Sequence, residues 1–200
     1  LDDGESICIY GDYDCDGVTS TALLYTFLSA LGGFVSYYIP NRATDGYGMN
    51  FKAIDKIKAD GTDLIITVDN GISSIEEAEY IYSLGMQLIV TDHHQIGENL
   101  PRAEAVINPH REDNEIEFRD FAGVGVAFKL ACALYDGDVE DLLEDYADYV
   151  TIGTIGDMVP LLNENRAIVK SGLKLINTDA KIGISALKKS TNSKAEHFSA

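Results

Sequence analysis

Short runs rich in β-branched and other apolar residues alternate with longer helix-like stretches, and this alternation constrains the fold more than any other feature of the chain. It is the signature of βαβ units, which build a parallel sheet covered by helices on both faces. The sequence therefore predicts an α/β fold with a doubly wound, mainly parallel five-stranded sheet. The expected strands are Ser6 to Tyr10, Phe34 to Ile39, Asp63 to Val68, Gln87 to Thr91 and Ala105 to Ile107.

Helical patterns fill the intervals between the expected strands and continue towards the end of the chain. Glycines mark the ends of the early helices, where a left-handed residue is wanted. The expected helices are Thr19 to Leu31, Phe51 to Ala59, Ser74 to Leu84, Val124 to Tyr135, Val139 to Val150, Glu164 to Asn177 and Ile182 to Lys189. Gly153 to Pro160 is expected to be a loop. We predict an α/β domain over residues 1–163 and a helical extension over residues 164–200.

The chain carries no pattern of a membrane span or a secretion signal. Its apolar runs fall short of the roughly 20 residues that cross a bilayer, and its start lacks a charged-then-apolar segment. Cys8, Cys15 and Cys132 are odd in number and show no CxxC spacing, so reduced thiols are expected, and packing roles for them, rather than disulfides or a zinc site. We expect a cytoplasmic protein. The start at Leu1, close to the first strand, suggests a fragment of a longer chain.

The formal net charge of -18 is unusual for a protein that binds nucleic acid, because phosphate binding normally needs a basic surface. The charge is unevenly distributed. Eight basic and 31 acidic residues precede Arg166, whereas seven basic and two acidic residues occupy Arg166 to Ala200. The seven acids from Asp136 to Asp148 are expected to form a solvated helical face rather than a cation site.

Acidic residues follow the expected strands, at the edge where an open parallel sheet binds its ligands. In an extended loop, Asp12, Asp14 and Asp16 would project to the same side. Carboxylates this close repel one another unless a cation lies among them. The other residues of this set are Asp69 after the third strand, Asp92-His93-His94 after the fourth, and Asp157 in the later loop.

Oxygen ligands with one or two imidazoles favour manganese or magnesium over structural zinc, and this many anionic ligands can hold two ions. The alternative is that each acid belongs to a turn or caps a helix, because Asp and Gly are common in strand-to-helix loops. Four such loops at one edge of the sheet favour a metal site.

The ordered set Asp12-x-Asp14-x-Asp16-Gly17, Asp69, Asp92-His93-His94 and Asp157 resembles the four motifs of the DHH superfamily of phosphoesterases. Within it, several further stretches resemble the RecJ branch of single-strand-specific exonucleases. These stretches are Tyr10 to Asp14, Ile39 to Arg42, Asp45 to Gly48, Ile107 to Arg111 and Ala122 to Lys129. The likeness covers nearly all of the chain to Leu161. Some RecJ proteins have His where this chain has Tyr10.

The resemblance implies two Mn2+ or Mg2+ ions. One would be held by Asp12, Asp14 and Asp69, and the other by Asp16, Asp69, His93 and Asp157, with Asp69 bridging them. His94 would contact phosphate or act as a general acid. Asp92 would orient a neighbouring histidine rather than bind metal.

The resemblance also implies a function: hydrolysis of single-stranded DNA from the 5′ end, with release of 5′-mononucleotides. Residues 1–163 would be the catalytic domain, and the extension would lead to a DHH-associated domain and an oligonucleotide-binding fold that this chain does not contain. The protein partners are unknown. One alternative is a DHH enzyme of small substrates: an oligoribonuclease with nucleoside-bisphosphate phosphatase activity, or a pyrophosphatase. Another is an inactive DHH scaffold in a replication assembly, which should have lost metal ligands that this chain keeps.

Candidate substrate contacts lie in the loops. Arg42 and Arg111 are candidates for phosphate binding because arginine offers a bidentate fork, and surface ion pairs are the alternative. Asn108 and His110 are candidate neighbours of Arg111. Tyr47 is a further candidate, either as a base-stacking platform or as a packed turn residue. Gly123 is another: either its N–H faces a phosphate, or its small size permits close helix packing.

Overall fold

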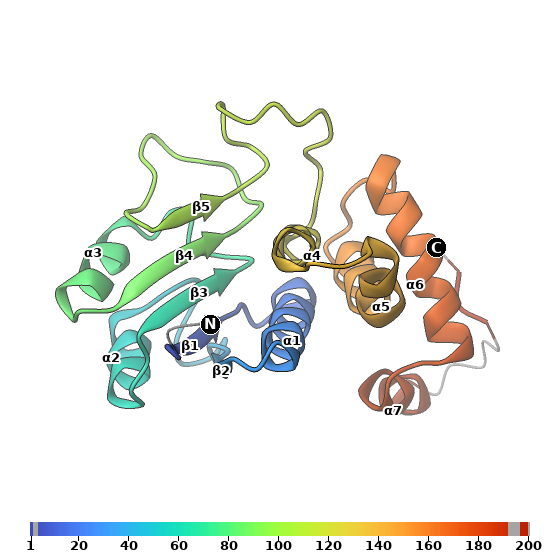
Figure 1. Ribbon diagram of the computed structural model, residues 1–200, viewed down its shortest axis with the longest axis horizontal. Coiled ribbons are helices and arrows are strands. Elements are labelled where there is room, and N and C mark those ends of the chain that lie inside the picture. The colour runs from blue at the N-terminus through green and yellow to red at the C-terminus, as the bar shows by residue number, and fades with distance from the viewer. Residues whose placement is uncertain (2–3, 192–196, 200) are drawn as a thin grey trace.

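The computed structural model describes residues 1, 4–191 and 197–199. Its strands form one all-parallel sheet in the order β2-β1-β3-β4-β5 (Figure 1). The strands are β1 (Ser6–Tyr10), β2 (Phe34–Tyr38), β3 (Leu64–Val68), β4 (Gln87–Thr91) and β5 (Ala105–Ile107). The predicted α/β fold is confirmed, and each strand ends within one residue of its expected position.

Helices cover both faces of this sheet (Figure 1). They are α1 (Cys15–Ala30), α2 (Phe51–Ala59), α3 (Ile75–Ser83), α4 (Gly123–Leu134), α5 (Val139–Gly156), α6 (Asn163–Thr178) and α7 (Ile182–Ser190). Successive side chains of a strand point to opposite faces, and β1 divides the core accordingly. Ile7 and Ile9 pack with α1, α4 and α5, whereas Cys8 and Tyr10 pack with α2 and α3.

Helix α1 begins at Cys15, four residues before the predicted start at Thr19. The reason is a cap: a side-chain oxygen of Asp14 accepts a hydrogen bond from the backbone N–H of Gly17 at 2.9 Å. Asp16 therefore lies in the first turn of the helix, and the expectation of an extended loop that carries three carboxylates on one side is wrong. The carboxylates still converge, but through a helical turn.

Helix α5 continues to Gly156, so the loop predicted from Gly153 to Pro160 is wrong in its first four residues. Gly153 is buried in the helix, and a Cβ atom there would lie 2.4 Å from Oγ1 of Thr19 on α1. Glycine is required for this close approach of α5, and packing outweighs its low helix propensity. Asp157 then caps the helix C-terminus.

Helix α6 packs directly on α5. Its buried Ile168 belongs to the same hydrophobic core as the face of the sheet that carries Ile7 and Ile9. Gly172 lies at the closest approach, since a Cβ atom at this position would be 2.0 Å from the carbonyl oxygen of Ala147 and 2.1 Å from Oγ1 of Thr151.

We expect Gly172→Ala to destabilise the protein by about 1–3 kcal/mol, because the two helices must separate to admit one methyl group. Gly183→Ala is the matched control: Gly183 lies in α7, and nothing lies within 4 Å of the position that an added methyl group would take, so alanine should be neutral or stabilising there. Urea denaturation of both variants measures the difference. Equal midpoints would show that the α5–α6 contact is not as close as described.

The acidic run from Asp136 to Asp148 lies mainly on an exposed face, as predicted, except at its end. Asp148 is fully buried, and one of its oxygens pairs with Nζ of Lys181 at 2.7 Å. Lys181 precedes α7, so this ion pair attaches α7 to α5. Lys194 and Glu196 of the basic tail lie outside the described residues. No helix in residues 1, 4–191 and 197–199 combines the length and apolar character needed to span a bilayer.

The strand order places a topological switch point between β1 and β3, because the chain leaves β1 towards β2 and later continues from β3 in the opposite direction. Ligands of open α/β sheets bind outside the carboxyl ends of the strands at such a point. Asp12 follows β1 and Asp69 follows β3, so both lie at this position.

Candidate metal centre

The acidic residues that follow β1, β3 and β4 lie together at one edge of the sheet. The strand register pairs Tyr10 with Thr67 and Val68 with Thr91, which brings the next residues side by side. Three overlapping groups of side chains have potential ligand atoms within 4.8 Å of one another. The groups are Asp12, Asp14 and Asp69; Asp16, His93 and Asp157; and Asp69, His93 and His94. All six predicted metal ligands are thus in one cluster.

Asp69 is shared by two of these groups and is only 1% exposed. Its backbone φ of +61° lies in the left-handed region, which is uncommon for a residue other than glycine. Burial, followed by the charges of Asp16 and Asp14, raises the pKa of Asp69 well above its ordinary value. Backbone strain and a strongly raised pKa at one residue are typical of a functional site.

Asp16 is buried against the N-terminus of α4. Its two carboxylate oxygens accept hydrogen bonds from the backbone N–H groups of Gly123 at 2.6 Å and Val124 at 2.8 Å. These donors favour the charged form, yet burial outweighs them and raises the pKa of Asp16. Of the two roles considered for Gly123, the contact disfavours presentation of its N–H to a phosphate. Instead, glycine permits close packing: a Cβ atom there would lie 2.6 Å from Cβ of Asp69.

His93 faces three carboxylates with one ring nitrogen. Its Nε2 atom lies 3.1 Å from Oδ1 of Asp69 and 3.8 Å from oxygens of Asp16 and Asp157. Although 3.1 Å is a hydrogen-bond distance, neither Nε2 nor Oδ1 of Asp69 has a partner with hydrogen-bond geometry. Buried polar atoms normally have one. Nε2 of His93 and Oδ1 of Asp69 thus approach each other without a hydrogen bond, and further carboxylates surround them. This arrangement is the one expected of ligands that bind a common cation.

Asp12 and Asp14 complete the cluster from the β1–α1 loop. Asp12 is 2% exposed and accepts a hydrogen bond from the N–H of Tyr13 at 2.7 Å, and burial raises the pKa of its carboxyl. Asp14 is exposed, and one of its carboxylate oxygens accepts the hydrogen bond that caps α1. In the part of the chain that the structure describes, no lysine or arginine forms an ion pair with the cluster. The negative charge of the cluster is therefore not neutralised by a basic side chain, and a bound cation would neutralise it.

His94 lies at the rim of the cluster, and its imidazole contacts two side chains. Nδ1 lies 2.7 Å from Oδ1 of Asp92, and Nε2 lies 3.2 Å from the hydroxyl oxygen of Tyr47. Burial raises the pKa of Asp92, but hydrogen bonds from His94 and from the N–H of Ile72 outweigh it and hold the pKa below its ordinary value. Asp92 therefore remains ionised and orients His94, which is the arrangement expected for these two residues.

The two arginines that are candidates for phosphate binding differ in their contacts. The exposed Arg42 lies over the ring of Tyr13, 5.5 Å from its centroid, and no described carboxylate lies within ion-pair distance of its guanidinium. Arg111, in contrast, pairs with Asp113 and donates to the carbonyl of Val106 at 2.6 Å. The structure thus favours Arg42 over Arg111 as a residue free to bind phosphate.

Asn108 and His110 belong to the loop that follows β5. The Asn108 amide donates to the carbonyl of His94 at 2.9 Å and accepts from the N–H of His110 at 2.8 Å. Asn108 is 2% exposed. Asn108 therefore supports the His94 loop, and both ends of its side-chain amide have partners within the protein.

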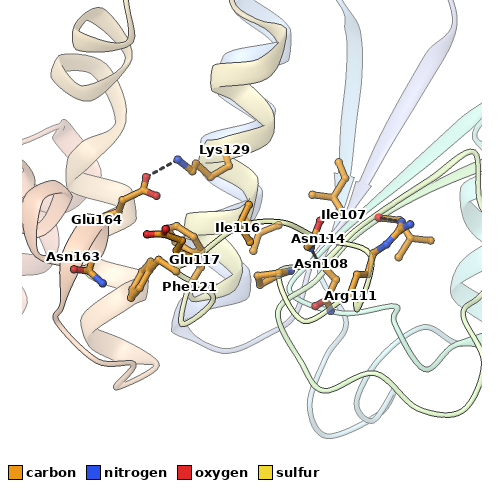
Figure 2. A pocket seen from close by; sticks show the side chains of 14 residues that line it. Ile107, Asn108, Arg111, Asn114, Ile116, Glu117, Phe121, Lys129, Asn163 and Glu164 are labelled. Carbon is orange, nitrogen blue, oxygen red and sulfur yellow. Dashed lines mark hydrogen bonds and ion pairs between the residues drawn. The ribbon is translucent and has the colours of Figure 1, made fainter.

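A cavity of about 860 Å3 lies between β5, the following loop, α4 and the start of α6 (Figure 2). Its walls include Ile107, Asn108, Ile116 and Phe121, and the ion pair of Lys129 and Glu164 crosses its rim (Figure 2). No member of the carboxylate cluster lines it. The side chains that could hold a cation lie at the sheet edge and not in this cavity.

Sequence reasoning missed the glycines that let the helices approach the carboxylates. A Cβ atom at Gly17 would lie 2.6 Å from the backbone of Asp12, and one at Gly153 would lie 2.8 Å from Oδ1 of Asp16. It also missed the contact between Tyr47 and His94. The signal for Gly17 was its place within the acidic motif, whereas no sequence pattern pairs Gly153 or Tyr47 with the cluster.

A family model described as the DHH family, N-terminal domain, matches residues 6–154. The single-stranded-DNA-specific exonuclease RecJ of Bacillus subtilis is 46% identical over 183 residues, which are 92% of this chain and 23% of that protein. RecJ of Escherichia coli is 41% identical over 211 aligned positions, covering 99% of this chain and 37% of that protein. The chain thus spans well under half the length of these relatives.

Solved structures agree with this comparison. A crystal structure of exonuclease RecJ bound to manganese superimposes with a TM-score of 0.84 at 37% identity, over 97% of this chain and 49% of that one. RecJ of Thermus thermophilus in complex with Mn2+ gives a TM-score of 0.79 at 35% identity, over 97% of this chain and 28% of that one. The match extends beyond the sheet to nearly all of the described residues.

Proposed function

The chain belongs to the DHH family, and from this premise we propose that it is the catalytic part of a metal-dependent exonuclease that degrades single-stranded DNA from the 5′ end and releases 5′-mononucleotides. The observation that carries the proposal is the single cluster of five aspartates and His93 at the switch point of the sheet. The proposed substrate, single-stranded DNA, is inferred from the RecJ relatives. An inactive scaffold is disfavoured because every predicted ligand is present, and a small-substrate enzyme because the relatives at 41–46% identity are DNA exonucleases.

Two Mn2+ or Mg2+ ions would be held by the five aspartates and His93 of this cluster. Asp12, Asp14 and Asp69 would hold one ion, and Asp16, Asp69, His93 and Asp157 the other, with Asp69 bridging. The ligand types fit hard to borderline divalent ions. Nε2 of His93 and Oδ1 of Asp69 support this assignment, because neither atom has a hydrogen-bond partner within the described part of the protein. When bound, such a pair of ions lowers the pKa of water and stabilises both oxygens of an in-line displacement.

The side chains around the ligands would position the DNA. Arg42, with its guanidinium near the acidic loop, would bind a backbone phosphate. His94 would donate from its imidazole to the phosphate or to the leaving oxygen, since Asp92 holds it at the rim where it remains 45% exposed. Asp92 would orient His94 and bind no ion.

The remaining length of the relatives suggests a division of labour. We propose that the acidic residues before Arg166 form the metal-binding half, and that a DHH-associated domain and an oligonucleotide-binding fold supply most of the DNA-binding surface. The basic stretch that begins at Arg166 would lead towards them. Alone, residues 1–200 should bind single-stranded DNA weakly, because affinity for a polyanion grows with the number of phosphates neutralised. The domain boundary at residue 163 and a cytoplasmic location stay predictions.

A nuclease assay with a panel of substrates tests the proposed function. We expect manganese-dependent release of mononucleotides from 5′-labelled single-stranded DNA, with much slower attack on duplex DNA, RNA and pyrophosphate. Asp69→Asn is the control that separates this activity from a contaminating nuclease. Faster hydrolysis of pyrophosphate or of short RNA than of DNA would favour the small-substrate alternative, and no metal-dependent hydrolysis of any substrate would contradict the proposal.

A further inference from the structure

The loop between β2 and α2 carries a tyrosine whose hydroxyl group reaches the rim of the metal centre. The hydroxyl oxygen of Tyr47 lies 3.2 Å from Nε2 of His94, and the two rings meet edge to face at 81°. Tyr47 is 58% exposed, so its ring is not held by the core. The contacts with His94 thus orient a side chain that is largely exposed.

The backbone around Tyr47 is built to keep this orientation. Gly46 and Gly48 have φ angles of +78° and +76°, and nothing lies within 4 Å of a Cβ atom at either position. Glycine is needed there for backbone conformation and not for space. The buried Tyr10 anchors the loop from below, since its hydroxyl donates to the carbonyl of Gly48 at 3.2 Å and accepts from the amide of Asn50 at 3.3 Å.

The contacts of His94 define one protonation pattern for the neutral ring. Nδ1 lies 2.7 Å from the Asp92 carboxylate, which can only accept, so Nδ1 carries the hydrogen. Nε2 is then the acceptor, and the Tyr47 hydroxyl donates to it. With both nitrogens engaged, the plane of the imidazole is fixed. Asp92 alone would leave the outer end of the ring free to swing, because one hydrogen bond does not fix a plane.

We propose that Tyr47 is a positioning residue for His94: its hydroxyl group, by donating to Nε2, fixes the plane of the imidazole at the rim of the metal centre. The inference rests on the proposed function for the role of His94, but the hydrogen bond itself does not. It differs from a base-stacking role of Tyr47 in the atoms involved, because stacking requires the ring and positioning requires the hydroxyl group.

The variants Tyr47→Phe and Tyr47→Ala separate the two roles, with Tyr80→Phe as the matched control. Tyr80 also donates its hydroxyl to a side chain, that of Asp55 at 2.6 Å, but on the far helices α2 and α3. We expect Tyr47→Phe to lower kcat about 3- to 10-fold with KM unchanged, which corresponds to the loss of one hydrogen bond. Tyr80→Phe should change neither. A raised KM in Tyr47→Ala together with full kcat in Tyr47→Phe would assign stacking and overturn the proposal.

A second measurement does not depend on activity. Nitrogen NMR of 15N-histidine-labelled protein, without metal and with Mg2+, should give an Nε2 resonance of His94 that moves in Tyr47→Phe and stays in place in Tyr80→Phe. An unmoved resonance would overturn the proposed contact. If the chain hydrolyses no substrate but the resonance moves, then the proposed function fails while the hydrogen bond stands.

Discussion

Replacing Asp69 by asparagine should reduce metal-dependent hydrolysis about 1,000-fold or more, because a shared ligand contributes to both ions and several kcal/mol of charge stabilisation are lost with it. Asparagine preserves the shape of the side chain, so the variant should remain folded. Asp12→Asn is the comparison, since Asp12 belongs to one ligand group only. It should retain more activity at saturating manganese. Equal residual rates for the two variants would contradict the bridging role of Asp69.

The same substitution should raise the melting temperature of the metal-free protein at neutral pH. Burial raises the pKa of Asp69, so its folded-state pKa exceeds its unfolded value of about 4. For a carboxyl shifted in this direction, stability falls as pH rises above the unfolded pKa, and asparagine removes that loss. Manganese should stabilise the wild-type protein because it binds the folded state, and it should stabilise Asp69→Asn far less. Thermal denaturation with and without manganese checks both expectations.

Gly123→Ala should reduce metal affinity and activity about 10- to 100-fold without any change to a ligand, which is the range for substitutions that displace ligand-supporting contacts. The new methyl group would lie 2.6 Å from Cβ, 2.7 Å from Oδ1 and 2.9 Å from Cα of Asp69. Because Cα belongs to the backbone, rotation of a side chain cannot relieve the clash. Helix α4 must move, and it would carry with it the N–H groups that bind Asp16.

Manganese titration followed by calorimetry measures this effect, with Gly183→Ala as the control. Both substitutions add one methyl group to a helix, but only the first adds it against the cluster. If Gly123→Ala binds manganese as tightly as the wild type, then α4 accommodates the methyl group without displacing Asp69. In that case the close packing of α4 would not be what positions the ligands.

Much of the fold follows from local sequence patterns. The strands were predictable because buried parallel strands are short, apolar and β-branched, and β1 and β3 are of this kind. Acidic residues at their carboxyl ends predicted the cluster, because parallel strands all end at the same edge. The starting point of α1 was not predicted, since Asp14 serves both as a helix cap and as a candidate ligand, and the metal site was favoured over the capping role that it also fills.

Features that depend on contacts between distant segments could not be predicted. Gly153 and Gly156 suggest a loop by propensity, whereas packing against α1 extends α5 through both. Asp148 belongs to an acidic run and is nevertheless buried, because Lys181 neutralises it from 33 residues away. The hydrogen bond between Tyr47 and His94 joins two loops that share no pattern. In each case the partner is defined by the folded structure and not by spacing along the chain.

Anomalous X-ray diffraction at the manganese absorption edge, from crystals grown with Mn2+, tests the central claim of a two-metal site most directly. We expect two peaks about 4 Å apart, as in other two-metal sites. One peak should lie among Asp12, Asp14 and Asp69 and the other among Asp16, Asp69, His93 and Asp157, with Asp69 contacting both. No anomalous peak in this cluster at saturating manganese, or ions bound only elsewhere on the molecule, would contradict the claim.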